Sequence, residues 1–428
     1  RNNDHMKPFI STICVLVCCS CASSVPTTVR LENPTALERP DEAFVFTHKQ
    51  LNPHGEGRRP VIVDTDGSYV PSQLDDLDGD GRWDELAFVY TLKPHQTVDL
   101  KIFRLNHAAE YPVFRVRTNV RYGKMTTPGK IVPLISDVHG KHNLPRGEGY
   151  PYQMDGVAWE NDRMGFRHYY DGRNCRDVYG KRVSDMVLDT VGIRPDGYPG
   201  DTYHVLADWG RDIMSAGGSF GLGALAMLTG DSLVRSGVLQ EDRTDIIDST
   251  CYDLLTKGPV RSVFRMRFRG WEVCGNKVDV TETTTIWAGR YGYENTVETG
   301  VLPAGDTLTT GIVRSFNDRP LVEKVIGDRY TLMMTHDRQT YNKEWYMGMA
   351  LIVPQENMYE TFDTPEAGAN IVKTWCVKLK PAAANTYRFN VYAVWELQDT
   401  RFSASAFFFD LIEKEALRML HPVKVEIR

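Results

Sequence analysis

Short segments in which apolar and polar residues alternate run along most of the chain. The clearest is VRSVFRMRFR at Val260–Arg269, where Phe264, Met266 and Phe268 face one way and the arginines between them face the other. From Ile246 onward such segments recur at intervals of roughly ten to fifteen residues, separated by Gly, Pro and Asp clusters. A long series of strands without helices between them predicts large antiparallel sheets packed face to face. The segments predicted as strands are 43–47, 61–63, 85–92, 97–105, 114–120, 260–269, 278–290, 308–314, 330–335, 347–354, 372–379, 387–395 and 423–427.

One segment near the C-terminus has the period of a helix instead. Ser405–Leu420 repeats apolar residues at helical spacing, as at Ile412 and Ala416. The prediction is therefore an all-β-dominated fold, a large antiparallel β-sandwich with few short helices. We expect a single sandwich domain over residues 22–428, in which loops between residues 133 and 230 carry the site.

Composition and charge exclude one class of function, the binding of nucleic acid. The 428 residues are 42% hydrophobic and 25% charged, which is typical of a globular protein outside the membrane. The net charge is −6, with no basic tail or run. Because nucleic-acid binding depends on a positive footprint, we expect no nucleic-acid partner.

Residues 1–21 have the pattern of an export signal. Lys7 precedes an apolar run at Phe9–Val17, which is too short for a comfortable membrane span, and small residues follow up to Cys21. This pattern resembles a bacterial lipoprotein signal, with Cys21 as the expected lipidated residue and Cys19 as the alternative. A plain cleaved signal peptide is the other interpretation. The lipoprotein interpretation predicts a protein anchored by its lipid in the periplasm or at the outer membrane.

An acidic loop lies between two predicted strands in QLDDLDGDGRWDEL. Its aspartates fall at positions 1, 3, 5 and 9, with Gly81 at position 6, which is a spacing that lets alternate oxygens converge on Ca²⁺. No glutamate stands at position 12 and the flanking segments are predicted strands, so the loop is a β-hairpin calcium loop rather than an EF-hand. It resembles the DxDxDGxxD loops of integrin-type repeats. An acidic hairpin without metal is the alternative. The predicted ligands of a structural calcium ion are Asp76, Asp78, Asp80 and Asp84, with the backbone carbonyl of Arg82.

Charged and aromatic residues are concentrated between residues 152 and 212. Carboxylates, arginines, tyrosines, tryptophans and His204 occur together there far more densely than elsewhere. A loop-rich segment that mixes both charges with aromatics favours a ligand or catalytic site, because such sites concentrate on loops held by a rigid scaffold. A set of salt-bridged surface loops is the alternative. Since Tyr169 and Tyr170 are adjacent, only one of them can face the site from a strand.

The motifs of this region and others carry a family resemblance. They are YQMDGVAWENDRMGFRHYYDGRN with YGK, YHVLADWGRD with GGSFGLG, GPVR, and the acidic loop. Over the whole mature chain, they resemble an exported family of bacterial polysaccharide-utilisation systems that is classed as a domain of unknown function (DUF 4861-like). The resemblance implies a β-sandwich of the galactose-mutarotase type. It also implies a likeness to ulvan oligosaccharide dehydratases, which act on uronic-acid-terminated oligosaccharides.

The residues fit uronate chemistry of this kind. Arginine holds and neutralises a carboxylate with two-pronged geometry, which acidifies the C5 proton. A base then removes that proton while an acid assists departure of the C4 oxygen, and histidine and tyrosine are the usual agents. His204 and Tyr170 are the predicted catalytic pair, with His168 and Tyr203 as substitutes. The predicted substrate-binding residues are Arg163, Arg167, Arg173, Arg261, Trp159, Trp209, Asp162, Asp171 and Lys181.

Two other functions compete with elimination by a dehydratase or lyase. Glycoside hydrolysis needs two carboxylates flanking the bond, and Glu160 with Asp212 or Asp162 could supply them. A non-catalytic glycan-binding lipoprotein would use the same aromatics and arginines without turnover. A cluster rich in titratable groups favours an enzyme over a binder, with an oligosaccharide as the partner and no organic cofactor. His204 as a buried core histidine is the structural alternative to its catalytic role.

Overall fold

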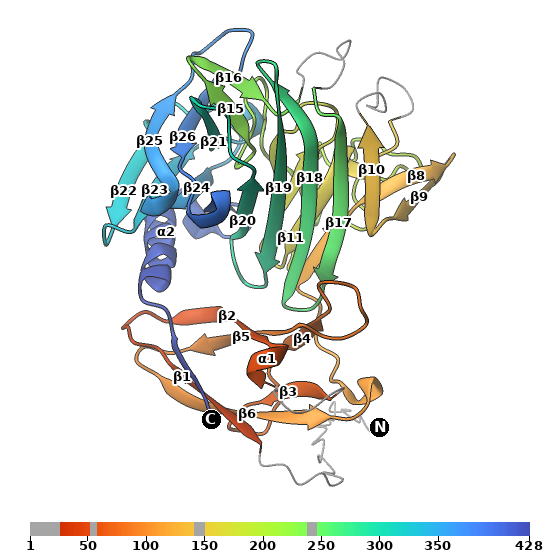
Figure 1. Cartoon of the computed structure of the whole chain (residues 1–428), viewed down its shortest axis with the longest axis vertical. Coiled ribbons are helices and arrows are strands. Elements are labelled where there is room, and N and C mark those ends of the chain that lie inside the picture. The colour runs from red at the N-terminus through yellow and green to blue at the C-terminus, as the bar shows by residue number, and fades with distance from the viewer. Residues whose placement is uncertain (1–25, 52–57, 141–149, 238–245) are drawn as a thin grey trace, which may run out of the picture.

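The computed structural model describes residues 26–51, 58–140, 150–237 and 246–428. The expected signal segment 1–21, with Cys21, lies outside them. Strands make up most of the molecule, in a larger upper body and a smaller lower body in the view of Figure 1. The ladder pairings between the named strands are antiparallel, which confirms the predicted fold class.

The upper body is built on a nine-stranded sheet. Phe264, Met266 and Phe268 of this sheet are buried in the main core, whereas the intervening Arg265 and Arg267 are half-buried on its other face, as the alternation predicts. The strands in spatial order are β10 (Ser136–Gly140), β17 (Ser249–Lys257), β18 (Arg261–Val273), β19 (Asn276–Trp287), β20 (Gly292–Thr299), β27 (Thr386–Trp395), β24 (Met347–Pro354), β23 (Tyr330–Asp337) and β22 (Val322–Ile326).

Two five-stranded sheets and a hairpin complete the upper body. Trp159 and Phe166 of the first five-stranded sheet, and Leu308 of the second, share the main core with Phe264. The sheets therefore form a sandwich around one apolar layer. The first sheet runs β14 (Gly210–Asp212), β13 (Arg176–Lys181), β12 (Met164–Tyr169), β11 (Gly156–Asn161), β7 (Thr118–Arg121); the second runs β16 (Ser232–Arg235), β15 (Ala226–Thr229), β21 (Asp306–Val313), β26 (Thr374–Leu379), β25 (Met358–Asp363); the hairpin is β8 (Gly123–Thr127) and β9 (Lys130–Pro133).

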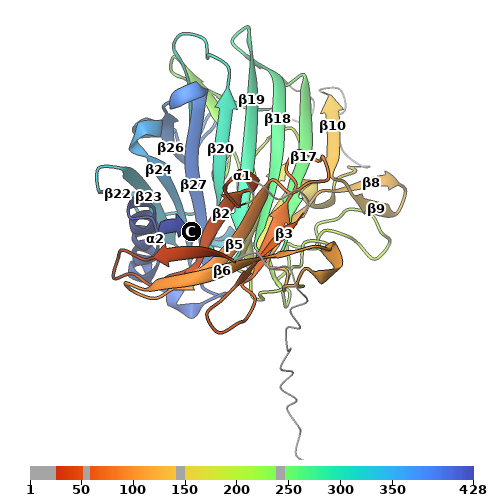
Figure 2. The same cartoon turned by 60° about the horizontal axis from the view of Figure 1, so that its bottom comes forward.

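The lower body has an apolar core of its own. Leu31, Phe44, Phe88 and Leu100 belong to this core and not to the main one. The last strand of the chain returns to pair with the first, and the strands of this lower body lie in front of the main sheet in Figure 2. The prediction of one sandwich domain did not distinguish the two cores. The strands are β28 (Lys424–Ile427), β1 (Thr27–Glu32), β6 (Thr97–Leu105) and β3 (Arg59–Val63) in one sheet, and β2 (Arg39–Thr47), β5 (Glu85–Leu92) and β4 (Ser72–Asp75) in the other.

Two α-helices occur in the described part of the chain. The predicted helix is α2 (Ser405–Leu420), which buries Phe408, Ile412 and Ala416 against β23, β24 and β27. The other, α1 (His48–Leu51), is a single turn after β2.

Among the described helices, none combines the length and apolar character that a membrane crossing requires.

Candidate active site

Both faces of the first five-stranded sheet carry side chains from the predicted site. Along β12, Phe166 and His168 point into the sandwich, while Arg167 and Tyr169 point to the outer face. The stretch that follows β13 covers this outer face, where Tyr203 packs against Tyr179 at 5.6 Å between ring centroids. The strand alternation therefore divides the central motif between two environments.

Arg167 is the centre of the outer environment. Its guanidinium is buried and lies 2.7 Å from Asp177, 2.7 Å from Asp212 and 3.1 Å from Asp155. The ring of Tyr169 packs on it at 4.2 Å, and the Tyr169 hydroxyl donates to Asp177 at 2.7 Å. We call these residues, with Tyr203 and His204, the Arg167 cluster.

Three carboxylates share one guanidinium in this cluster, so the negative charges exceed the positive one. Burial raises the pKa of Asp177, and the neighbouring Asp212 raises it further, against the opposing effect of Arg167. Burial also raises the pKa of Asp155. The cluster therefore favours holding an additional proton, which is a property of acid–base sites.

His204 stands where the Arg167 cluster meets solvent. Its side chain is 55% exposed, with Nε2 3.6 Å from Asp212 and Nδ1 3.9 Å from Asp201. The nearby Asp212 carboxylate raises the pKa of His204, against a smaller lowering by partial burial. A core role for His204 is therefore wrong, since over half of the side chain is accessible. It is an accessible imidazole oriented by two carboxylates, an arrangement suited to general acid–base catalysis.

The Tyr170 side chain lies in the inner environment, and the contact of Tyr170 with the cluster is made by its backbone N–H, which donates to the carbonyl of Asp155 at 2.6 Å. Its ring packs edge-on against Tyr122 at 5.7 Å, Tyr152 at 5.4 Å and His139 at 5.0 Å. Its hydroxyl is buried and has no hydrogen-bond partner among the described residues. His168, on the same inner face, bonds to Asn174 and has its pKa lowered to about 3, chiefly by burial. The structure therefore does not bring His204 and Tyr170 together, and their prediction as a catalytic pair is wrong.

Glu160 and Lys181 form a pair with no exposed side-chain surface. Lys181 Nζ lies 2.6 Å from Glu160 Oε2. Glu160 Oε1 also accepts hydrogen bonds from the backbone N–H groups of Val187 and Leu188, both at 2.8 Å. Asp162 also forms an ion pair, with Arg117 at 2.8 Å. Of the carboxylates suggested for hydrolysis, only Asp212 lies in the Arg167 cluster.

The other predicted substrate-binding residues are dispersed. Arg173 reaches the rim of the cluster, because its guanidinium lies over the Tyr169 ring at 4.5 Å and pairs with Asp171 at 2.6 Å. Arg163 lies over the Tyr291 ring at 5.5 Å. Trp159 is wholly buried in the main core, and Trp209 is half-buried against Tyr179.

Arg261 joins the two bodies. Its guanidinium pairs with Asp75 and, at 2.7 Å, with Glu85, which end β4 and begin β5. Asp75 is buried and also accepts a hydrogen bond from Thr256 at 2.6 Å. A guanidinium committed to two carboxylates in this way ties the acidic hairpin to the main sheet.

Sequence reasoning gave no role to Asp155, Asp177 or Asp201. The signal for Asp177 is its register, since it stands directly opposite Arg167 across β12 and β13. Asp155 has no such signal, because it precedes β11 in a turn with a positive φ of 61°. Tyr203, the predicted substitute, does lie in the cluster, with its hydroxyl 3.0 Å from Asp155 and 3.1 Å from Asp201.

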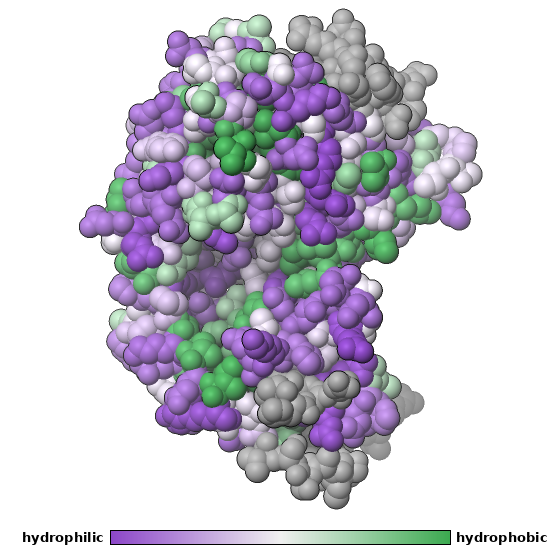
Figure 3. Space-filling view, viewed as in Figure 1, coloured by the Kyte–Doolittle hydropathy of each residue, from purple (hydrophilic) through white to green (hydrophobic). Residues whose placement is uncertain are grey.

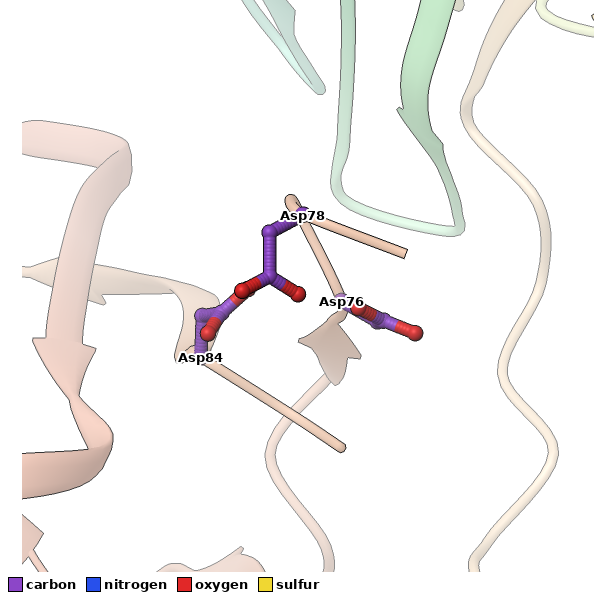
Figure 4. Close-up of side chains that lie close together, drawn as sticks. All are labelled: Asp76, Asp78 and Asp84. Carbon is purple, nitrogen blue, oxygen red and sulfur yellow. The ribbon is translucent and has the colours of Figure 1, made fainter. Parts of the chain in front are cut away.

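The acidic loop connects β4 and β5 as a hairpin, and Figure 4 shows three of its side chains, those of Asp76, Asp78 and Asp84. Oxygens of Asp76, Asp78 and Asp84 lie within 4.8 Å of one another, so three of the four predicted aspartates are brought together. Asp80 is not part of this group; its carboxylate accepts from the N–H of Arg82 at 2.8 Å. Three carboxylate oxygens at this separation fit a hard cation such as Ca²⁺.

Fold and cluster together describe a β-sandwich protein with an accessible histidine at the edge of a buried acid–base network. The chain belongs to the family described as a domain of unknown function, DUF4861, whose model matches residues 31–425. The predicted family is therefore confirmed.

Comparison with individual proteins shows distant likeness. An uncharacterized protein, P7, of Formosa agariphila is 22% identical over 298 residues, which cover 66% of this chain and 65% of that protein. A solved protein in glycosyl hydrolase family 38 from Enterococcus faecalis has a TM-score of 0.50 at 8% identity, over 94% of this chain and 47% of its own. An α-mannosidase from Enterococcus faecalis has a TM-score of 0.49 at 8% identity, over 94% of this chain and 46% of its own. The chain thus spans about half the length of these structures, and its likeness to the first of them is one of fold.

Proposed function

We propose that this protein is a carbohydrate-active enzyme that acts on uronic-acid-containing oligosaccharides by elimination, as a dehydratase or lyase. The observation that carries the proposal is the position of His204, exposed at the rim of the Arg167 cluster and oriented by Asp212. Membership of the family is consistent with this role. The fold shared with a protein in a glycosyl hydrolase family supports carbohydrate chemistry as a class, without indicating the reaction.

In the proposed reaction His204 takes the C5 proton of the uronate ring. The electrons of the C5–H bond form the C4–C5 double bond, and the C4–O bond breaks. Tyr203, whose ring centroid lies 5.0 Å from that of His204, is the acid that protonates the leaving oxygen. Arg173 at the rim would bind the substrate carboxylate, in exchange for its present partner Asp171. If the leaving oxygen carries a sugar the enzyme is a lyase, and if it leaves as water the enzyme is a dehydratase.

Two further proposals concern the setting of the enzyme. A calcium ion at Asp76, Asp78 and Asp84 would stabilise the hairpin. Its role would be structural rather than catalytic, because Arg261 links that hairpin to the main sheet. Export and lipid anchoring through Cys21, in the periplasm or at the outer membrane, rest on the sequence pattern of residues 1–21 alone.

The test uses purified protein from Ala22 onward with uronic-acid-terminated oligosaccharides. Absorbance of a 4,5-unsaturated uronate is followed for the wild type, for His204→Ala, and for His107→Ala as a control at an exposed histidine outside the cluster. A rise that only His204→Ala loses supports elimination. New reducing ends without absorbance would support hydrolysis instead. Binding of the oligosaccharides without any product would identify a glycan-binding protein.

A further inference from the structure

A cleft of about 190 Å³ lies between the two bodies, away from the Arg167 cluster. The surface is hollowed there, on the left between the upper and lower halves of Figure 3. Its walls come from β2, the β19–β20 region, β27 and the end of α2. The volume is below the roughly 300–1,000 Å³ of sites for larger ligands, so the cleft has room for about one ring.

Most charges in this cleft neutralise each other. Arg290 lies 2.7 Å from Glu415 and 3.4 Å from Glu42, and Arg418 also pairs with Glu415. Glu294 is the exception, since it forms no ion pair with any residue in the described part of the chain. The cleft walls therefore carry three carboxylates, those of Glu42, Glu294 and Glu415, against the two guanidiniums of Arg290 and Arg418, so that one negative charge is in excess.

Glu294 is the middle member of a row of polar side chains. It stands opposite Thr285 on β19 and opposite Asn390 on β27, and all three residues line the cleft. Neighbouring strands lie about 4.8 Å apart, so the row places three hydrogen-bonding groups along a length that one pyranose ring spans. Trp287 and Tyr392 supply aromatic surface beside the row. Convergent polar groups between aromatic walls are the usual composition of a ligand site.

We infer that this cleft binds one neutral sugar residue, whose hydroxyl groups donate to Glu294 and bond to Thr285 and Asn390. A neutral ring is favoured over a uronate, because a cleft with one negative charge in excess repels a further carboxylate at close range. The choice of a sugar rests on the proposed function, whereas the choice of a neutral ligand rests on the charges of the cleft. Both bodies contribute walls, through Glu42 of β2 in the lower body and through Glu294 of β20 and Arg418 of α2 in the upper body, so their packing creates the site.

Enclosure by the cleft walls also raises the pKa of Glu294. The positive charges of Arg290 and Arg261, and then a hydrogen bond from Trp287, oppose this rise in the pKa. The same enclosure strengthens hydrogen bonds between the carboxylate and sugar hydroxyls, since bonds to charged groups are the stronger class.

The test is calorimetric titration of the mature chain with the methyl glycosides of rhamnose, xylose, galactose and glucose, and with methyl glucuronide. At least one neutral glycoside should bind saturably and more tightly than the glucuronide. Glu294→Ala should weaken that binding at least tenfold. Glu298→Ala, at an exposed glutamate on the same strand, should leave it unchanged. Glu294→Gln should reduce the preference for neutral glycosides over the glucuronide.

Three results would overturn the inference: no neutral glycoside binds, the glucuronide binds best to the wild type, or Glu294→Ala binds like the wild type. The elimination assay, run on the same variants, separates this inference from the proposed function. Glycoside binding without any elimination would leave the cleft assignment standing and remove the proposed reaction. Elimination that proceeds while no neutral glycoside binds would support the proposed reaction and overturn the cleft assignment.

Discussion

Replacing Lys181 by methionine tests whether the Glu160–Lys181 pair supports the fold rather than binding substrate. Neither side chain has exposed surface, and Lys181 Nζ donates to Glu160 and to the carbonyls of Asn161 and Asp185 at 2.6–2.8 Å. Lys181→Met would leave a buried carboxylate without its cation. Removing one partner of a buried pair costs about 3–5 kcal/mol, so we expect a loss of that size in the free energy of unfolding.

A double-mutant cycle isolates the interaction between the two residues. Glu160→Gln alone leaves an unpaired ammonium and should also destabilise the protein. The double variant should be more stable than the sum of the two single losses implies, with a coupling energy of at least about 1 kcal/mol. Lys343→Met is the control, because its pair with Asp318 is exposed and contributes only about 0–1 kcal/mol.

Urea unfolding followed by tryptophan fluorescence measures all four proteins and the control. The reasoning would be refuted if Lys181→Met cost no more than Lys343→Met. It would equally be refuted if the variant kept its stability and lost turnover, since that result would place Lys181 in the substrate site.

Four further predictions follow from the described contacts. If neutral His204 is the base, kcat/KM should increase with pH through a pKa above the ordinary 6.5, because Asp212 favours the protonated form; a flat profile would exclude this role. Tyr170→Phe should raise the free energy of unfolding by up to about 1 kcal/mol and leave turnover unchanged, because it removes a buried hydroxyl without a partner; lost turnover would return Tyr170 to the active site. Ca²⁺ should raise the melting temperature of the wild type but not of Asp78→Asn, and an equal increase in both would place the ion elsewhere. Arg261→Met should cost about 3–5 kcal/mol by leaving Asp75 buried without its cation, which urea unfolding would detect.

Local patterns in the sequence predicted the elements well. Phe264, Met266 and Phe268 alternate with arginines, and the structure buries the three apolar side chains as expected. The predicted helix Ser405–Leu420 has the same bounds in the structure. Such features depend on residues a few positions apart, so periodicity is enough to identify them. The predicted strand 114–120 begins only at Thr118, which shows the usual limit at element ends.

Contacts between residues that are far apart in the sequence could not be predicted from periodicity. Glu160 and Lys181 both looked like site residues by composition, yet their burial depends on β11 and β13 flanking β12 in the folded sheet. Arg261 was assigned to substrate because arginine suits a carboxylate, and its carboxylates proved to be Asp75 and Glu85 of the other body. Composition indicated the right chemistry there, but the partner lay far along the chain.

The site itself was predicted in part. His204, Asp212 and Arg167 were chosen from one dense motif, and the structure places all three in one cluster. Tyr170 was assigned to the same site, although strand alternation directs Arg167 and Tyr169 outward and leaves Tyr170 against His139 within the sandwich. Which of two neighbouring tyrosines faces outward depends on where β12 begins, and that register was not available from the motif.

The most direct test of the elimination proposal is the turnover of an oligosaccharide whose terminal uronate carries deuterium at C5. The proposal predicts a primary isotope effect on formation of the unsaturated product, and loss of that product in His204→Ala with folding intact. Release of new reducing ends at a rate independent of the deuterium, and retained in His204→Ala, would contradict it.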